Sequence, residues 1–254
     1  MLTAKSLTKR YGALTAVDRL DLEIGRGELF GFLGPNGAGK TTTIKMLVGL
    51  LRPTSGMASV AGFDLLRQGE AAKARIGYVP DTPVLYERLT GREFLEFSGD
   101  LYHVPRATRD RRIDALLQLF DLKDRGHDFL SSYSRGMRQK ISLAAALLHD
   151  PQVLFLDEPT VGLDPRSARQ MKDILIDFCR EGKTVFLSTH ILEIAERMCT
   201  RVAIVNHGAV VAEGTLDQLR TMVRSDGQSL EQIFLQLTGG GEEDVRALLA
   251  ELER

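Results

Sequence analysis

The stretch that decides the fold is Glu28-Leu29-Phe30-Gly31-Phe32-Leu33-Gly34-Pro35-Asn36-Gly37-Ala38-Gly39-Lys40-Thr41-Thr42. It opens with a short apolar run that is typical of a buried strand, and its middle is rich in glycine. The residues that follow repeat apolar side chains at the spacing of a helix face, namely Ile44, Leu47, Val48 and Leu51. The sequence therefore predicts a strand, a tight turn and a helix in immediate succession.

The turn fits the pattern G-x-x-x-x-G-K-[ST], in which Gly34, Gly39, Lys40 and Thr41 hold the fixed positions. Glycines let successive backbone N–H groups point into one concavity, and the helix adds unpaired N–H groups with a partial positive charge. Lys40 can reach the β- and γ-phosphates, and the Thr41 hydroxyl can ligate Mg²⁺. A glycine turn without a ligand is the structural alternative, but the flanking strand and helix favour a nucleoside triphosphate site. The predicted phosphate-binding residues are Gly34, Pro35, Asn36, Gly37, Ala38, Gly39, Lys40, Thr41 and Thr42.

The composition fits one large α/β domain, or a core with an inserted lobe. Of 254 residues 43% are hydrophobic, and 33 basic against 34 acidic residues give a net charge of −1. We therefore expect no nucleic-acid partner, although a balanced total is compatible with a local basic patch. The sequence shows no signal-peptide core, no apolar run near the ~20 residues of a membrane helix, and too few cysteines for a disulfide framework. These features predict a soluble, cytosolic chain, whose membrane span, if it needs one, belongs to another polypeptide.

The N-terminal region is predicted to form strands. Residues 2–8 form one strand and residues 14–24 another, and the second alternates apolar and polar side chains like a half-exposed antiparallel strand. Tyr11 lies between them and is either a surface turn residue or an aromatic platform for a purine ring, a contact worth roughly 1–3 kcal/mol. Two further short strands are predicted at residues 58–61 and 75–80.

From residue 82 to about residue 149 the pattern becomes helical, which indicates a lobe inserted between two halves of the core. Two apolar helix faces carry this prediction: Phe94, Phe97 and Leu101, and then Ile113, Leu116, Leu117 and Phe120. The lobe ends in the polar segment Ser132–Lys140. The helix after that segment has one apolar face, made of Ile141, Ala144, Ala145 and Leu148.

The core resumes with the apolar strand Val153–Asp157, followed directly by Glu158. A continuous apolar strand is typical of the buried middle of a parallel sheet, and ligands bind at the carboxyl ends of such strands. Asp157 can hold Mg²⁺ through water, and Glu158 can polarise an attacking water molecule. Two carboxylates that cap the strand are the structural alternative. A helix to about Arg180 and strands near residues 184–188, 202–205 and 210–212 complete the core, and His190 follows the first of these strands.

The expected fold is α/β, with a P-loop NTPase core of mostly parallel sheet, an N-terminal antiparallel β subdomain and an inserted helical subdomain. Residues 1–222 form the ATPase domain, with the core at 1–81 and 151–222 and the helical subdomain at 82–150. Residues 223–254 form an amphipathic helical tail that packs on its own domain or contacts a second copy or a partner. Two apolar stripes define the tail: Leu230, Ile233, Phe234 and Leu237, and then Val245, Leu248, Leu249 and Leu252.

From about Leu2 to Gly214 these motifs, in this order, resemble the ATP-binding-cassette (ABC) ATPases. The loop 34–42 resembles their Walker A motif and the strand 153–158 their Walker B motif, with Glu158 and Lys40 as catalytic residues. The remaining matches are Tyr133-Ser134-Arg135-Gly136-Met137 at the signature segment, Gly162-Leu163-Asp164 at the D-loop, His190 at the catalytic switch histidine and Tyr11 at the adenine-stacking aromatic. The resemblance implies that Ser134, Gly136 and Asp164 contribute to nucleotide binding.

Two positions depart from the family pattern. The usual signature is Leu-Ser-Gly-Gly-Gln, whereas this chain has Tyr-Ser-Arg-Gly-Met, which retains Ser134 and Gly136 and adds the charge of Arg135. The Q-loop glutamine of the family falls at Asp81. An ionised carboxylate is shorter and cannot donate a hydrogen bond, so Asp81 would accept from a magnesium-bound water or ligate the ion and would repel a γ-phosphate. We expect Asp81 to tune magnesium dependence or coupling.

The resemblance also implies partners and a location. Two cassettes, either two copies of this chain or one copy with a similar chain, meet head to tail around ATP and Mg²⁺ and open after hydrolysis. Residues 85–95, 133–140 and 229–239 resemble ATPases that pair with ABC-2-type export permeases for drugs, antibiotics, lipids or polysaccharides. Residues 83–89 are candidates to receive a permease helix, or they pack within the lobe. This predicts a cytoplasmic protein peripheral to the inner face of the cell membrane. The alternatives are a soluble ABC ATPase acting on ribosomes or DNA, and a nucleotide kinase or ATP sensor.

Overall fold

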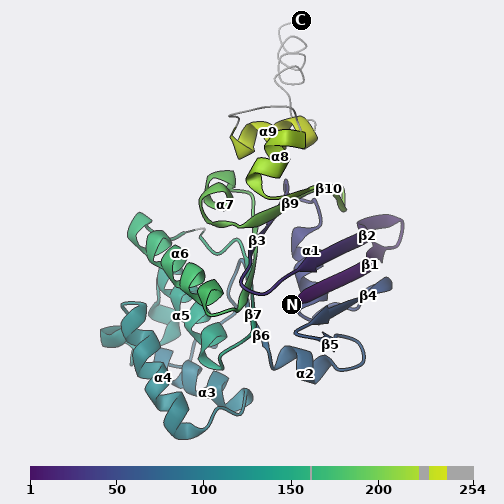
Figure 1. Ribbon diagram of the computed structural model, residues 1–254. Helices are drawn as coiled ribbons and strands as arrows, with labels where there is room; N and C mark the ends of the chain where they lie inside the picture. Colours follow the sequence, from purple (N-terminus) through teal and green to yellow (C-terminus); the bar gives the residue numbers. More distant parts are fainter. Residues whose placement is uncertain (161, 223–228, 239–254) are drawn as a thin grey trace, which may run out of the picture.

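The computed structural model describes residues 1–160, 162–222 and 229–238, which form two β-sheets with helices packed around them (Figure 1). The antiparallel sheet lies to one side of the parallel sheet, and most helices lie on the other side (Figure 1). Helix α1 (Lys40–Leu47) packs between the two sheets, because its buried side chains share one apolar core with both of them.

The antiparallel sheet has the strand order β2-β1-β4-β5. Its strands are β1 (Leu2–Tyr11), β2 (Leu14–Ile24), β4 (Ser55–Val60) and β5 (Phe63–Asp64). The predicted alternation of β2 is confirmed, since Val17, Leu20, Leu22 and Ile24 are buried and the residues between them are more exposed. Strand β1 continues to Tyr11, beyond its predicted end, because Tyr11 pairs with Leu14 across a two-residue turn.

The larger sheet has the order β10-β9-β3-β8-β7-β6, and only the β9–β10 pair is antiparallel. Its strands are β3 (Leu29–Leu33), β6 (Ile76–Val79), β7 (Val153–Asp157), β8 (Thr184–Thr189), β9 (Arg201–Asn206) and β10 (Ala209–Gly214). The interior strands β3, β7 and β8 are buried along their whole length. Because Leu33 pairs with Thr189, and Asp157 with Ser188, the residues after these three strands meet at one edge of the sheet.

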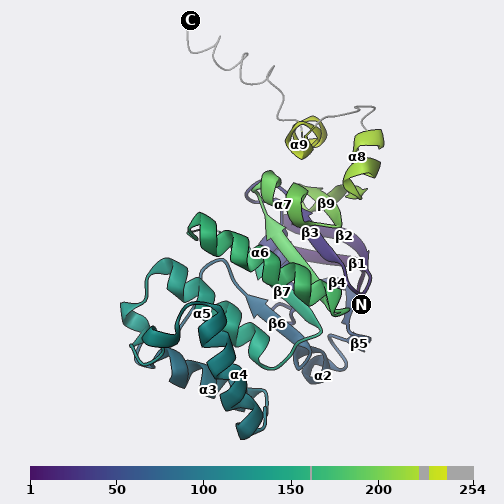
Figure 2. The same cartoon turned by 60° about the vertical axis from the view of Figure 1, so that its left-hand side comes forward.

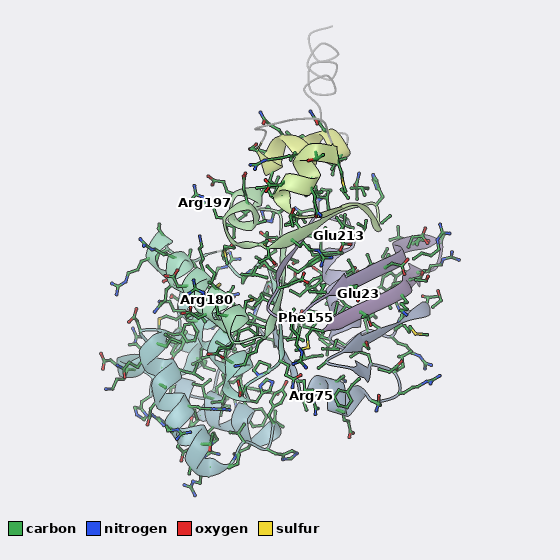
Figure 3. The ribbon with its side chains drawn as sticks, in the orientation of Figure 1. Glu23, Arg75, Phe155, Arg180, Arg197 and Glu213 are labelled. Carbon is green, nitrogen blue, oxygen red and sulfur yellow. The ribbon has the colours of Figure 1, made fainter. Side chains whose placement is uncertain are left out.

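Aromatic packing joins neighbouring strands within the larger sheet, and Arg201 links that sheet to the antiparallel sheet. Phe155 lies at the centre of the molecule (Figure 3), and its ring centroid is 5.4 Å from that of Phe186. Arg201 forms ion pairs with Glu28 and Glu213 and donates to the carbonyl oxygen of Glu23. Arg201, the first residue of β9, therefore joins this strand to β2, to β10 and to the residue before β3.

The helical lobe consists of α3 (Gly91–Leu101), α4 (Arg106–Leu119) and α5 (Arg135–Leu148), and it lies away from the antiparallel sheet (Figure 2). These helices fall within residues 82–150, where the sequence places an inserted helical subdomain. The predicted face of α3 is only partly buried, since Phe94 is buried whereas Phe97 and Leu101 are exposed. The ring of Phe97 contacts that of Tyr86, which is also exposed.

The remaining helices are α2 (Gly69–Lys73), α6 (Pro165–Arg180), α7 (Leu192–Met198), α8 (Leu216–Met222) and α9 (Leu230–Thr238), with short 3₁₀ turns at Lys123–Arg125 and Leu130–Ser132. The first tail stripe packs on its own domain, because Leu230 and Ile233 of α9 are buried against Ala195 and Leu219. The second stripe, at residues 245–252, lies outside the described residues. No helix among the described residues is both long and apolar enough to cross a bilayer. The proposed domain boundaries remain a prediction.

Candidate nucleotide site

The loop between β3 and α1 has a backbone that only glycine fits at two points. Gly39 has φ +101°, and a Cβ atom there would stand 2.4 Å from the carbonyl oxygen of Ala16. A Cβ on Gly34 would stand 2.5 Å from the carbonyl oxygen of Val205. Helix α1 then begins at Lys40 with no side-chain cap and no acidic residue in its first turn. Its first backbone N–H groups therefore offer hydrogen bonds and a partial positive charge to an anion.

Lys40 is buried beside this loop. Its Nζ donates to the carbonyl oxygens of Gly34, at 2.7 Å, and Pro35, at 3.1 Å, and it lies 3.9 Å from Glu158 Oε1. Burial lowers the pKa of Lys40 and outweighs the opposing effect of Glu158 and Asp157. A phosphate in the loop would supply the strong anionic partner that the two carbonyl oxygens only partly replace.

Asp157 connects the phosphate loop to β8. Its Oδ2 accepts from Thr41 Oγ1 at 2.9 Å, and its Oδ1 accepts from the Ser188 hydroxyl. The residues fit a magnesium site, because Mg²⁺ takes oxygen ligands at 2.0–2.1 Å and the edge of such an octahedron is about 2.9 Å. Among the described residues no group of three or more His, Cys, Asp or Glu forms a metal site. An ion here would therefore complete its shell with phosphate oxygens and water, as Mg²⁺ commonly does.

Glu158 and His190 form a second pair at the same edge. The His190 Nδ1 lies 2.9 Å from Glu158 Oε1, while Glu158 Oε2 accepts from Thr189 Oγ1 at 3.1 Å and from the His190 backbone N–H at 3.3 Å. The backbone of Glu158 has φ +50°, a left-handed conformation that costs of order 1–3 kcal/mol outside glycine. Its N–H donates to the Ser188 carbonyl oxygen, which holds the carboxylate over the sheet edge in spite of that cost.

Lys40, Thr41, Asp157 and Glu158 line a pocket of about 360 Å³, which we call the nucleotide pocket, and His190 lies outside its lining. Its lining residues are Tyr11, Leu14, Ala16, Asn36, Gly37, Gly39, Lys40, Thr41, Thr42, Asp81, Asp157 and Glu158. Tyr11 is 48% exposed, and Lys9 Nζ lies 5.2 Å from its ring centroid, so the ring is available at the rim. Burial, together with the negative charges of Asp157 and Asp81, raises the pKa of Tyr78 to about 12.

Several predicted residues lie outside this lining. Gly34, Pro35 and Ala38 shape the loop from behind: Ala38 N donates to the Pro35 carbonyl oxygen, and Ala38 O accepts from Gly208 N. Asp164 caps α6, and the hydroxyl and backbone N–H of Ser167 hold the pKa of its carboxyl low.

Residues 133–137, the signature segment, lie at the start of α5. Ser134 caps this helix by accepting from Met137 N at 3.3 Å. Gly136 approaches the D-loop, because a Cβ on it would stand 3.5 Å from the Gly162 carbonyl oxygen. Neither Ser134 nor Gly136 lines the nucleotide pocket of its own chain.

Sequence reasoning missed four contributors to the site. Ser188 and Thr189 position the two carboxylates, and Leu14 and Ala16 line the pocket. Ser188 could have been found once β8 was placed beside β7, because two parallel strands that end at the same edge bring Ser188 opposite Asp157. No signal in the sequence marks Leu14 or Ala16, since their position depends on the turn that follows Tyr11.

A phosphate loop between strand and helix, with Asp157 and Glu158 at the carboxyl edge of a parallel sheet, defines a P-loop nucleoside triphosphatase. The family model described as ABC transporter matches residues 17–161, more than half of the chain, and the chain belongs to this family. It is an ATP-binding cassette with ATPase activity. The predicted fold and family are confirmed, while the roles of individual site residues remain predictions.

Curated relatives and solved structures agree with this assignment. The daunorubicin resistance ATP-binding protein DrrA3 of Streptomyces coeruleorubidus is 44% identical over 225 residues, which cover 89% of this chain and 71% of DrrA3. A fluoroquinolones export ATP-binding protein of Mycobacterium tuberculosis is 41% identical over 242 residues, which cover 91% of this chain and 79% of that protein.

Among solved structures, an ATP-binding subunit of an ABC transporter superposes with a TM-score of 0.89 at 37% identity, covering 93% of this chain and 99% of that one. A dimeric ATP-binding cassette in a post-hydrolysis state, bound to ADP and Pi, gives a TM-score of 0.78 at 25% identity, covering 85% of this chain and 99% of that one.

Proposed function

We propose that this chain is the ATP-hydrolysing subunit of an exporter that carries a drug, antibiotic, lipid or polysaccharide through a separate membrane permease. The observation that carries the proposal is that residues 80–84 border both the nucleotide pocket and an apolar groove on the surface. Asp81 lines the nucleotide pocket, whereas Pro80, Pro83 and Val84 line an apolar surface groove of about 290 Å³. Relatives named for daunorubicin resistance and fluoroquinolone export support the transport of compounds of this kind.

In this proposal Tyr11 stacks on adenine, and the loop from Gly34 to Thr42 holds the phosphates. Lys40 turns from the carbonyl oxygens of its own loop toward the β- and γ-phosphates. Thr41 and Asp157 would hold Mg²⁺, which offsets the charge that develops on the transferred phosphoryl group. Ser188 keeps the Asp157 carboxylate aimed at Thr41.

Glu158 takes a proton from the attacking water as the water oxygen bonds to the γ-phosphorus. The bond from that phosphorus to the β–γ bridging oxygen breaks, giving ADP and phosphate. His190 and Thr189 contact the Glu158 carboxylate, so they orient the base. The γ-phosphate itself would be contacted by His190 and Lys40. A water molecule must displace part of the Lys40–Glu158 contact, which at 3.9 Å is long and replaceable.

The site is completed by a second copy of this chain or a similar cassette. Ser134 is exposed at the start of α5, and Gly136 is partly exposed beside it. In a head-to-tail pair, the Ser134 hydroxyl, the first N–H groups of α5 and the D-loop residue Asp164 would cover the nucleotide of the opposite chain. The dimeric cassette with bound ADP and Pi supports this arrangement. Loss of the γ-phosphate removes the bridge, and the pair opens.

The groove is the proposed permease contact. Its lining residues are Tyr78, Pro80, Pro83, Val84, Leu85, Phe94, Ser98, Tyr102, Ser142, Ala145 and Ala146. Val84 is 90% exposed, and Tyr86 and Phe97 expose apolar surface beside the groove. Clustered exposed apolar side chains mark interaction sites, and an amphipathic helix fits a groove of this kind. The chain would then lie at the inner face of the membrane.

A photo-crosslinking amino acid at Val84 tests the export function in cells of the native host. We expect Val84 to cross-link to an integral membrane protein, and the matched probe at Leu119, exposed on the same lobe but outside the groove, to give no such product. Cross-links from Val84 to ribosomal proteins or DNA would support the soluble alternative and overturn the export proposal. The balanced charge of the chain disfavours that alternative.

Asp81 is proposed to tune the response to magnesium. Since the carboxylate faces the same pocket as Thr41 and Asp157, Asp81→Gln should shift the magnesium concentration that gives half-maximal ATPase activity. Magnesium titrations of wild type and Asp81→Gln at saturating ATP measure the shift. Superimposed curves, together with unchanged transport coupling, would remove this role.

A further inference from the structure

The groove and the signature segment are joined by a short set of polar contacts around Arg138. Arg138 Nη2 donates to Glu87 Oε1 at 3.0 Å, and Arg138 Nε donates to the Tyr133 carbonyl oxygen at 3.3 Å. Tyr133 directly precedes Ser134, the cap of α5. One planar guanidinium group therefore contacts both the start of the signature segment and a residue of the segment 83–89.

Backbone hydrogen bonds at Glu87 and Leu89 reinforce this connection. The Glu87 carbonyl oxygen accepts from Ser131 N at 3.2 Å, and the Leu89 carbonyl oxygen accepts from Leu130 N at 2.9 Å. Residues 130–132 form the 3₁₀ turn that leads into the signature segment. The residues after the groove-lining Pro83, Val84 and Leu85 thus run alongside the residues before Ser134.

The ion pair is the part of this connection that is suited to switching. The side chain of Arg138 is 27% exposed and that of Glu87 is 59% exposed, so a small displacement of either segment would let water replace the contact. If the ion pair opens, the backbone hydrogen bonds would still keep residues 87–89 beside residues 130–131. The Arg138 guanidinium group would no longer fix the position of Glu87 relative to Tyr133. A contact that can be made or lost at small cost gives an element with two arrangements, which coupling between two sites requires.

We propose that the Glu87–Arg138 pair couples the groove to the signature segment, so that closure on ATP changes the groove and occupancy of the groove changes closure. This rests on the proposed function, since it needs Ser134 to meet nucleotide across a dimer and the groove to receive a permease helix. Glu87 and Arg138 are positioning residues. Their effect passes through the Tyr133 carbonyl oxygen to the cap at Ser134.

The coupling can be measured on the chain alone, with a fluorescent reporter in the groove. Val84→Cys, labelled with an environment-sensitive maleimide dye, places the reporter on a side chain that is 90% exposed. Burial raises the pKa of Cys179 to about 11 and that of Cys199 to about 12, so the native thiols react slowly at neutral pH. A Glu158→Gln background keeps ATP bound during the measurement.

We expect ATP with Mg²⁺ to change the dye emission in this parent chain. Glu87→Gln and Arg138→Gln should each reduce that change about fivefold or more, which is the lower end of typical coupling factors. The double variant should lose no more than either single variant, because both substitutions remove one shared link. Dimer formation at saturating ATP, followed by light scattering, should persist in all three, although more ATP is needed.

A matched ion pair in the same lobe provides the control. Arg92 and Asp114 have side chains 28% and 67% exposed, close to the values for Arg138 and Glu87. Arg92→Gln should therefore leave the dye response unchanged. A parent chain that dimerises on ATP but whose dye response is insensitive to Glu87→Gln and Arg138→Gln would overturn the coupling alone. A parent chain that never dimerises with ATP would overturn the proposed function, and the coupling with it.

Discussion

The nucleotide pocket and the signature segment differ in how many of their functional side chains already have partners within the chain. In the nucleotide pocket, Lys40 contacts two carbonyl oxygens and Glu158, and Asp157 accepts from two hydroxyl groups. In the signature segment, Ser134 and Arg135 are exposed, and no acidic residue stands in the first turn of α5. A single chain therefore contains a preorganised binding site and, separately, an exposed helix start that attracts anions. In the proposed function, this helix start contacts a nucleotide held by a second chain. Substitutions in the two regions should separate binding from dimer-dependent hydrolysis.

The largest effect is expected for Glu158→Gln in the nucleotide pocket. The amide cannot accept the proton of the attacking water, so kcat should fall by roughly 10²–10⁴ while ATP still binds. Phosphate release gives kcat, and light scattering should show an ATP-bound dimer that persists. Glu193 is an exposed carboxylate on α7, so Glu193→Gln serves as the control and should retain wild-type turnover. Full turnover by Glu158→Gln would falsify the role given to Glu158.

Gly39→Ala tests whether the phosphate loop tolerates a side chain at the point where its backbone approaches Ala16 closely. Its new Cβ would meet the Ala16 carbonyl oxygen at 2.4 Å on a backbone with φ +101°. We expect loss of about 1–3 kcal/mol of folding stability and at least about tenfold weaker ATP binding, since the loop must shift. Urea unfolding and titration with a fluorescent ATP analogue measure the two effects.

Gly69→Ala is the matched control for the glycine test. A Cβ at Gly69 meets no atom within 4 Å, and the residue opens α2 with ordinary backbone angles. This substitution should be neutral or stabilising by about 0.4–1 kcal/mol. Equal losses in the two variants would show that the close approach at Ala16 is unimportant.

The same contrast explains what the sequence could and could not predict. The phosphate loop and Asp157-Glu158 are local patterns, whose residue types are dictated by backbone geometry and charge. The structure has the predicted strand and helix on either side of the loop and the predicted strand before Glu158, while the roles of these residues stay predictions. Ser188 was missed as a contributor because its contact with Asp157 depends on strand register, which no local pattern encodes. Asp164 was predicted from resemblance to contact nucleotide, and within its own chain it caps α6, so its role across a dimer remains a prediction.

The spacing of apolar residues alone could not predict which side chains of the helical lobe are exposed. The spacing of Phe94, Phe97 and Leu101 predicts one apolar face but cannot say what covers it. In the structure only Phe94 is buried, and Tyr86 stacks edge-on against Phe97 at 5.3 Å between ring centroids. An apolar stripe at helical spacing shows that one face of the helix is apolar. It does not show whether that face packs against its own chain or against another chain.

A drop in pH should loosen the contact between the lobe and the core through His149. Its Nε2 donates to the Ile76 carbonyl oxygen at 3.0 Å, and its ring stacks on Tyr102. Its buried Nδ1 has no hydrogen-bond partner among the residues that the structure describes. Burial lowers the pKa of His149 from 6.5 to about 4, against the smaller opposing effect of the Ile76 bond. Between these values the unfolded chain binds a proton that the folded chain does not, so stability falls as pH decreases through this range.

The expected loss attributable to His149 is about 1–2 kcal/mol between pH 7 and pH 5. Urea unfolding at the two pH values gives the difference. His149→Phe keeps an aromatic ring against Tyr102 and removes the titrating group, so its own difference should be smaller by that amount. The same pH dependence in wild type and variant would exclude His149 as the cause.

Ser134→Ala in the signature segment is expected to change stability only slightly. It is nevertheless an informative substitution, because it separates a role in hydrolysis from a role in stability. Ser134→Ala removes the hydroxyl that accepts from Met137 N, and the loss of a helix cap costs about 1 kcal/mol. Thr90 caps α3 in the same lobe through a capping box with Glu93, so Thr90→Ala should cost a similar amount. Both variants should bind ATP like wild type, because neither residue lines the nucleotide pocket.

Hydrolysis distinguishes these two cap variants. Ser134→Ala should reduce ATP turnover and ATP-dependent dimer formation, because its hydroxyl would face the nucleotide of a second chain. Thr90→Ala, which weakens the same lobe by the same mechanism, should leave turnover intact. If both variants lost turnover equally, the loss would follow from weakening of the lobe, and the signature segment would have no separate part in catalysis. If only Ser134→Ala loses turnover, the exposed start of α5 acts on nucleotide that its own chain does not hold.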